Sequence, residues 1–102
     1  MNTYILTYDW LTFNATPAQV HTFVSTHRDV SSWYQAYTGT YIFKSEADVA
    51  LLSQSFRGFF GGATFFVGLV FPSLTGGALP QAVWDWVNDN KKPTQGLLPK
   101  TP

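Results

Sequence analysis

Few residues of this 102-residue chain have types and spacings that support chemistry. Its two histidines, His21 and His27, would point about 120° apart on one helix, whereas a helical zinc pair is normally four residues apart. We therefore do not expect a zinc site, and we expect His27 to meet free carbonyl groups at a helix end and His21 to be exposed or packed. The chain has no Gly-x-Ser-x-Gly elbow and no phosphate-binding Gly-x-x-x-x-Gly-Lys loop.

Asp9 follows the apolar run that ends at Tyr8, near the end of the first expected strand. An aspartate at the end of a strand commonly accepts hydrogen bonds from loop amides. Turn chemistry alone therefore predicts a loop-stabilising role for Asp9.

Residue patterns predict the elements that position these side chains. Thr16-Pro17 is typical of a helix start, Thr38-Gly39 of a tight turn, and Ser45 with Asp48 approximates a capping box. Val20, Val24 and their neighbours recur at helical spacing, whereas later runs are rich in aromatic and β-branched residues. We expect strands at 3–8, 32–37, 40–44 and 63–71 and helices at 17–27, 45–59 and 80–89.

Composition limits the classes of function. Six Lys plus Arg balance six Asp plus Glu, and charged residues make up only 12% of the chain, about half the usual share. This balance does not favour nonspecific nucleic-acid binding, which depends on phosphate neutralisation. The chain has no cysteine and hence no disulfide. We expect one domain at residues 1–90 and an extended proline-containing tail at 91–102.

A long uncharged stretch between Gly58 and Trp84 raises the question of a membrane segment. Gly61-Gly62, Pro72 and Gly76-Gly77 divide it, which favours a buried strand over a bilayer span. The N-terminus shows no pattern of a secretory signal. We therefore expect a cytoplasmic protein.

Large side chains are predicted on both faces of the sheet, although two helices cover only one face. The second aromatic face is therefore expected to need a partner. Aromatic side chains on a sheet can stack nucleobases, or they can fill a protein interface. The low charge favours a homodimer or another protein partner over nucleic acid. The candidate partner-binding residues are Trp33, Tyr34, Tyr37, Tyr41, Phe43, Trp84 and Trp86.

Four short motifs resemble a known family: Tyr8-Asp9 at the end of the first strand, Trp33 in the second, the run 39–44 (Gly-Thr-Tyr-Ile-Phe-Lys), and a late tryptophan-bearing helix. Together they resemble the small CRISPR adaptation subunit, an endoribonuclease, and its SinR-like relatives. The resemblance implies an α+β ferredoxin-like fold, βαββαβ with a four-stranded antiparallel sheet, here with an additional C-terminal helix. It also implies that Asp9 binds a metal at a two-fold dimer interface, where a divalent ion could lower the pKa of a bound water or steady a phosphate. The loop-stabilising role and this implied role both stay open for Asp9. The loop after Asp9 lacks the basic residues expected beside a nucleic-acid substrate.

We weigh three functions, of which the link to nucleic-acid defence and the nuclease are implied by the resemblance. The first is a non-catalytic protein-binding or scaffold module that acts as a homodimer without a cofactor and is linked to nucleic-acid defence. The second is a nuclease dependent on Mg²⁺ or Mn²⁺, with Asp9 as the catalytic and metal-binding residue across a dimer. The third is a viral or mobile-element inhibitor of a host defence complex. We favour the first, since one carboxylate per chain is a sparse metal site.

Overall fold

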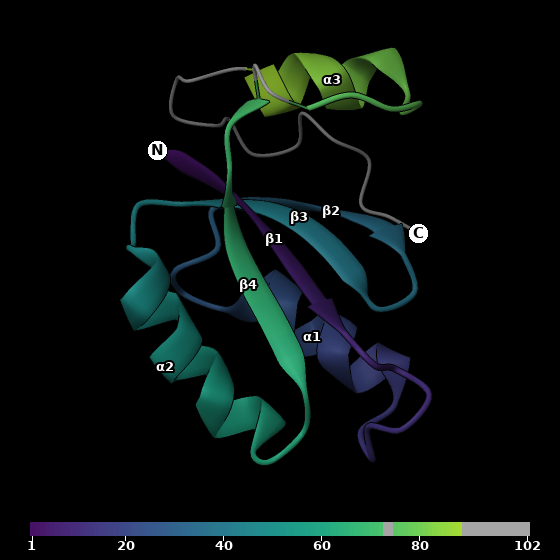
Figure 1. Ribbon diagram of the computed structural model, residues 1–102, viewed down its shortest axis with the longest axis vertical. Coiled ribbons are helices and arrows are strands. Elements are labelled where there is room, and N and C mark those ends of the chain that lie inside the picture. The colour runs from purple at the N-terminus through teal and green to yellow at the C-terminus, as the bar shows by residue number, and fades with distance from the viewer. Residues whose placement is uncertain (73–74, 89–102) are drawn as a thin grey trace.

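The computed structural model describes residues 1–72 and 75–88 of the chain. One four-stranded antiparallel sheet has the strand order β2-β3-β1-β4, so β2 and β4 are its edges (Figure 1). This arrangement confirms the predicted α+β fold and is consistent with a ferredoxin-like topology. The expected end of the third helix at residue 89 and the expected tail at 91–102 lie outside the described residues. The elements in chain order are β1 (Asn2–Tyr8), α1 (Pro17–Thr26), β2 (Ser32–Tyr37), β3 (Thr40–Ser45), α2 (Val49–Phe60), β4 (Phe65–Val70) and α3 (Gln81–Asn88).

Helix α1 begins as its sequence predicts. The Thr16 side chain accepts a hydrogen bond from the backbone N–H of Gln19 at 3.2 Å, and the Gln19 side chain accepts one from the backbone N–H of Thr16 at 2.8 Å. This reciprocal capping box and Pro17 in the first turn satisfy the free amides at the helix start. The helix ends at Thr26, one residue earlier than expected, because His27 has an extended backbone and is the C-cap.

Helix α2 begins later than expected. Asp48 is its N-cap, and its carboxylate accepts a hydrogen bond from the backbone N–H of Leu51 at 2.8 Å. Ser45 does not cap the helix, because it is the last residue of β3 and is fully buried. Its hydroxyl accepts a hydrogen bond from the backbone N–H of Ala47 in the turn between the two elements. Of the predicted pair, Asp48 is the N-cap of α2, whereas Ser45 stabilises the turn that precedes the helix.

The main core lies between the sheet and helices α1 and α2. Antiparallel register places Tyr4 opposite Phe43 and Leu6 opposite Tyr41, so these four side chains share the face that the helices cover. Aromatic rings connect the two helices, with Phe23 and Phe59 stacked at 4.1 Å between centroids. Burying this apolar surface is the main contribution to the stability of such a small domain. The buried residues of this core are Tyr4, Leu6, Tyr8, Val20, Val24, Tyr41, Phe43, Leu52, Phe56 and Phe60.

Helix α3 covers part of the opposite, second face of the sheet, apart from α1 and α2 (Figure 1). Val83, Trp86 and Val87 are buried there and pack against Tyr34 and Ile42. The expectation that only another molecule could cover this face is therefore corrected: the chain covers part of it with its own third helix. A short amphipathic helix lowers its free energy by docking its apolar stripe on the sheet.

Strand β4 is shorter than the expected 63–71, since Ala63 and Thr64 belong to the connection after α2 and Phe71 follows the strand. The uncharged stretch contains this strand and the start of α3, not one long helix. Within residues 1–72 and 75–88, no helix has the length and apolar character needed to cross a bilayer.

Candidate functional site

The second face of the sheet has an uncovered end. Direct antiparallel pairs share a face, and the registers place Tyr37, Thr40, Thr7 and Phe66 in one row from edge to edge. The hydroxyls of Thr7 and Thr40 lie 3.2 Å apart in the middle of the row. Tyr37 and Phe66 at its two ends are 71% and 61% exposed. This row is a candidate binding surface that contains no charged side chain.

On strands β2 and β3, the other rows of the second face lie beneath α3. Tyr34 and Ile42 pack beneath the helix, and the indole N–H of Trp86 donates a 2.8 Å hydrogen bond to the Ser32 hydroxyl. The ammonium of buried Lys44 lies 5.4 Å from the centroid of the Trp86 ring, within the range of a cation–π interaction. The candidate surface is therefore limited to the end of the face away from α3.

Strand β4 carries exposed apolar side chains on both faces. Phe66 lies on the second face opposite Thr7, whereas Leu69 lies opposite Tyr4 on the helix-covered face and is still 44% exposed. Phe71, just after the strand, is 59% exposed. Gly68 leaves room for the Phe66 ring, because a Cβ atom at Gly68 would lie 2.8 Å from that ring. We call the exposed side chains of Phe66, Leu69 and Phe71, with the outward backbone of the strand, the β4 edge.

The outward backbone groups of β4 can be assigned from the ladder. The N–H of Tyr8 donates to the carbonyl of Gly39 at 3.0 Å, so the backbone of Tyr8 faces β3. Because backbone direction alternates along a strand, the residues of β1 that face β4 are Thr3, Ile5 and Thr7. Their partners on β4, which face β1, are Phe66, Gly68 and Val70. The N–H and C=O groups that face outward are consequently those of Phe65, Val67 and Leu69.

The predicted partner-binding aromatics differ widely in their burial. Tyr41 and Phe43 are fully buried, and Trp86 is 5% exposed, so these three are core residues of this chain and are removed from the candidate surface. Trp33 packs against the main core, and Tyr34 packs beneath α3. Trp84 is half-buried on α3, and only Tyr37 is largely exposed. The predicted residues therefore do not form one surface.

Tyr41 and His21 form a polar pair at the margin of the main core, with Tyr41 buried and His21 half-buried. The Tyr41 hydroxyl lies 3.2 Å from Nδ1 of His21. Burial, with a smaller contribution from Tyr8, raises the pKa of Tyr41 to about 12. The phenol is protonated at neutral pH and satisfies its polar atom within the core. His21 is therefore packed, one of the two placements expected for it.

Asp9 lies in the exposed loop after β1. Its Oδ1 accepts a hydrogen bond from the backbone N–H of Leu11 at 3.1 Å, which is the loop-stabilising role of an aspartate at a strand end. Among residues 1–72 and 75–88, no cluster of three or more His, Cys, Asp or Glu side chains could hold a metal ion. A metal site at Asp9 would need further ligands from outside the described residues, so the nuclease hypothesis stays a prediction.

His27 joins the end of α1 to α2. Its Nε2 lies 2.8 Å from the Ser55 hydroxyl, and its Nδ1 accepts a hydrogen bond from the backbone N–H of Asp29 at 3.1 Å. Its ring also packs edge-on against Phe23 and Phe56. The expected contact with helix-end carbonyls is replaced by these side-chain and loop contacts. Burial is the main cause that lowers the pKa of His27 below its ordinary value of 6.5, opposed by Asp29 and reinforced by Arg28.

We expect the protein to lose stability as the pH falls below about 6.5. The folded state binds fewer protons at His27 than the unfolded state in that window, so protonation favours unfolding, and the stability is fully present above it. Urea midpoints measured between pH 5 and pH 8 test this, with His27→Gln as the comparison. The slope of the midpoint against pH should be smaller in the variant. An unchanged slope would show that other groups cause the pH dependence.

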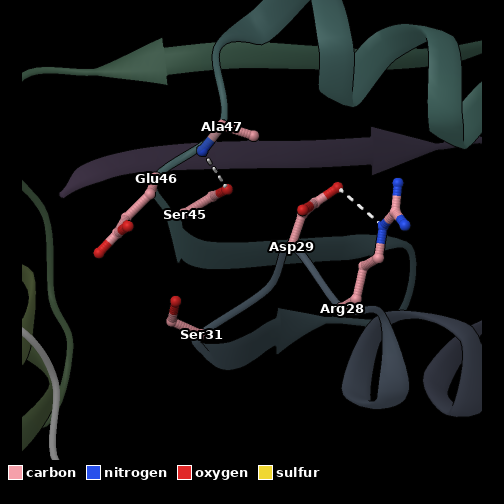
Figure 2. Close-up of a pocket in the computed structure, with 6 residues that line it drawn as sticks. All are labelled: Arg28, Asp29, Ser31, Ser45, Glu46 and Ala47. Carbon is pink, nitrogen blue, oxygen red and sulfur yellow. Dashed lines mark hydrogen bonds and ion pairs between the residues drawn. The ribbon is translucent and has the colours of Figure 1, made fainter.

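A polar pocket of about 250 Å³ lies where the α1–β2 and β3–α2 connections meet. Asp29 Oδ2 is buried there without a hydrogen bond, and it lies 3.9 Å from Nε of the exposed Arg28. Figure 2 shows the Asp29 carboxylate turned toward Arg28 and the Glu46 side chain pointing the other way. An ion pair of this length with an arginine that is 88% exposed contributes little. The lining side chains do not converge on one ligand (Figure 2). The pocket is lined by Arg28, Asp29, Ser31, Ser45, Glu46 and Ala47.

Comparison with protein-family models, with curated proteins and with solved structures finds no match to this chain. The site must be argued from its own geometry. The residues of the β4 edge were missed as a binding surface by sequence reasoning, which treated this segment as a buried strand. The signal was available in the uncharged run that contains Phe66 and Leu69, but only the strand order shows that the run is an edge.

Proposed function

We propose that this protein is a non-catalytic binding module that self-associates through the β4 edge. The observation that carries the proposal is an edge strand without charge whose exposed apolar side chains, Phe66 and Leu69, lie on opposite faces of the sheet. A partner that docks on one face would cover only one of them. A partner strand that continues the sheet would contact both and would also pair the outward backbone groups.

The two edges of the sheet differ in how they are protected. Strand β2 has an irregularity between Gln35 and Tyr37, and such bulges twist an edge away from pairing. Strand β4 keeps one regular register with β1 from Phe65 to Val70. It also lacks the lysines or prolines that commonly guard an exposed edge. The β4 edge is therefore the better surface for a second chain.

Charge supports a protein partner rather than nucleic acid. The chain has a formal net charge of +0, and the described strand β4 and the row from Tyr37 to Phe66 contain no cation to neutralise phosphates. Asp9 follows the strand that carries Thr7 and adds negative charge near that end of the sheet. A second copy of this chain meets no like charge at β4, which makes self-association the simplest form of the proposal.

We expect Phe66→Lys to weaken self-association. A cation at this position removes an exposed aromatic ring and places like charges near each other when two β4 strands approach. The dissociation constant should rise about tenfold or more, which corresponds to about 1.4 kcal/mol. The measurement is sedimentation equilibrium, or light scattering after size exclusion, over a wide range of protein concentration.

The matched control is Tyr37→Lys, at the opposite end of the same row and 71% exposed. It should leave the dissociation constant nearly unchanged if the β4 edge is the interface. Equal weakening by both variants would indicate docking of the whole second face instead. A wild-type chain that stays monomeric at high concentration would overturn the proposed self-association.

A further inference from the structure

We infer that two copies pair their β4 strands antiparallel about a two-fold axis at Val67, which makes one continuous eight-stranded sheet from two four-stranded sheets. This inference rests on the proposed function and adds the partner's geometry. It starts from the free backbone groups, because unpaired strand edges bind other strands through main-chain hydrogen bonds. Within the described residues, β4 pairs only with β1.

The direction of the backbone selects the register. Phe65, Val67 and Leu69 face outward, as the ladder between β1 and β3 requires. In a symmetric antiparallel pair, only a centre at Val67 lets all three residues exchange hydrogen bonds with the second copy. Val67 then lies opposite itself, and Phe65 lies opposite Leu69 of the second copy. With the axis at Phe66, Leu69 would lie opposite a residue outside β4 of the second copy. With the axis at Gly68, the same would hold for Phe65.

The side chains fit this register on both faces. On the helix-covered face, the half-exposed Leu69 meets Phe65, whose own ring is stacked on Phe60 at 4.9 Å between centroids. On the second face, Phe66 lies opposite Gly68 of the second copy. An aromatic ring directly opposite a glycine covers the exposed backbone that the glycine leaves. The register therefore buries Phe66 and Leu69 together.

Electrostatics places no barrier in the way of this pairing. The run from Gly58 to Trp84 contains no charged residue, so no Lys, Arg, Asp or Glu of one β4 strand meets its own copy across the axis. A two-fold contact brings the residues near the axis close to their symmetry equivalents, so a single charge there would be repelled by its own copy. The uncharged run removes that cost for a second copy of this chain.

The absence of cysteine from the chain allows the register to be tested directly. In the full-length Val67→Cys variant, the two Cα atoms across the axis would be about 5.5 Å apart, which suits a disulfide. Mild oxidation should link the dimer on the order of a hundredfold faster than it links Tyr37→Cys, because the effective concentration in a dimer is millimolar. Non-reducing electrophoresis measures the rate.

Two further variants distinguish the registers. Leu69→Cys should form few linked dimers, since the two copies of residue 69 would lie about 13 Å apart along the strands. An equal mixture of Phe66→Cys and the double variant Phe66→Ala, Gly68→Cys should give a mixed disulfide, because these positions face each other and the loss of the Phe66 ring makes room for the new Cβ atom. This second test holds even when Val67→Cys fails to fold.

The outcomes separate this inference from the proposal beneath it. A wild-type chain that is dimeric by mass and is weakened by Phe66→Lys, but gives no fast linkage at Val67 or in the mixture, would overturn the pairing centred at Val67 and leave self-association through the β4 edge in place. Fast linkage of Leu69→Cys alone would overturn the register. A monomeric wild-type chain would overturn both.

Discussion

Phe56→Ala is expected to destabilise the protein by about 3–5 kcal/mol, the largest effect that we predict for a single side chain. Phe56 is fully buried on α2, and its ring contacts those of Phe23, Phe43 and His27. Truncation leaves a cavity between the helix layer and the sheet that the surrounding rings cannot fill. Domains of this size are stable by only about 5–15 kcal/mol, so much of the stability would be lost.

Urea denaturation monitored by circular dichroism measures this loss. Phe71→Ala is the control, because it makes the same chemical change at a side chain that is 59% exposed. Its cost should be within about 0.5 kcal/mol at protein concentrations low enough to keep the chain monomeric. Equal losses in both variants would contradict the placement of Phe56 at the centre of the core.

Trp86→Ala is expected to release α3 from the sheet. Trp86 is the largest buried side chain of that helix. Its truncation removes the hydrogen bond to Ser32 and the cation–π interaction with Lys44. The docking free energy should fall by about 3 kcal/mol. Eight residues form a marginal helix in water on their own, so α3 should unfold locally while the main core stays folded.

Hydrogen exchange of the backbone amides of α3 tests this separation of the two clusters. Trp84→Ala is the matched control, since it makes the same replacement on the same helix at a half-buried position. Exchange in α3 should become much faster in Trp86→Ala than in Trp84→Ala, and exchange in β1 should change little. Global unfolding of Trp86→Ala would show that the docking of α3 is essential for the whole fold.

Most of the fold could be predicted from local patterns. Thr16-Pro17 is a strong start signal, and the turn at Thr38-Gly39 joins two strands as expected. The start of α2 was misplaced because Ser45 and Asp48 are both good caps in isolation. Pairing with β1 extends β3 to Ser45, so only Asp48 is left free to cap the helix. Such a choice depends on tertiary contacts that a local pattern does not contain.

The candidate site was harder to predict than the fold. Composition shows that aromatic residues are abundant, but it does not show which of them the core uses. Tyr41 and Phe43 alternate inward with the β3 pleat and are buried, whereas Tyr37 lies past an irregularity and is exposed. Strand order then decides which strands are edges, and no local signal in β4 reports that order. The role of Asp9 in a metal site stays a prediction, because the described residues form no cluster of three or more potential metal ligands around it.

The absence of lysine and proline from β4 (Phe65–Val70) also affects the tendency of the protein to aggregate. A regular strand without lysine or proline can also pair with unfolded chains when its own copy is not bound, and growth beyond a closed pair leads to fibrils. A closed pair shields that template, and dilution uncovers it. We therefore expect aggregation to be fastest when folded protein is scarce and unfolded neighbours are abundant, as during rapid synthesis or after heat shock.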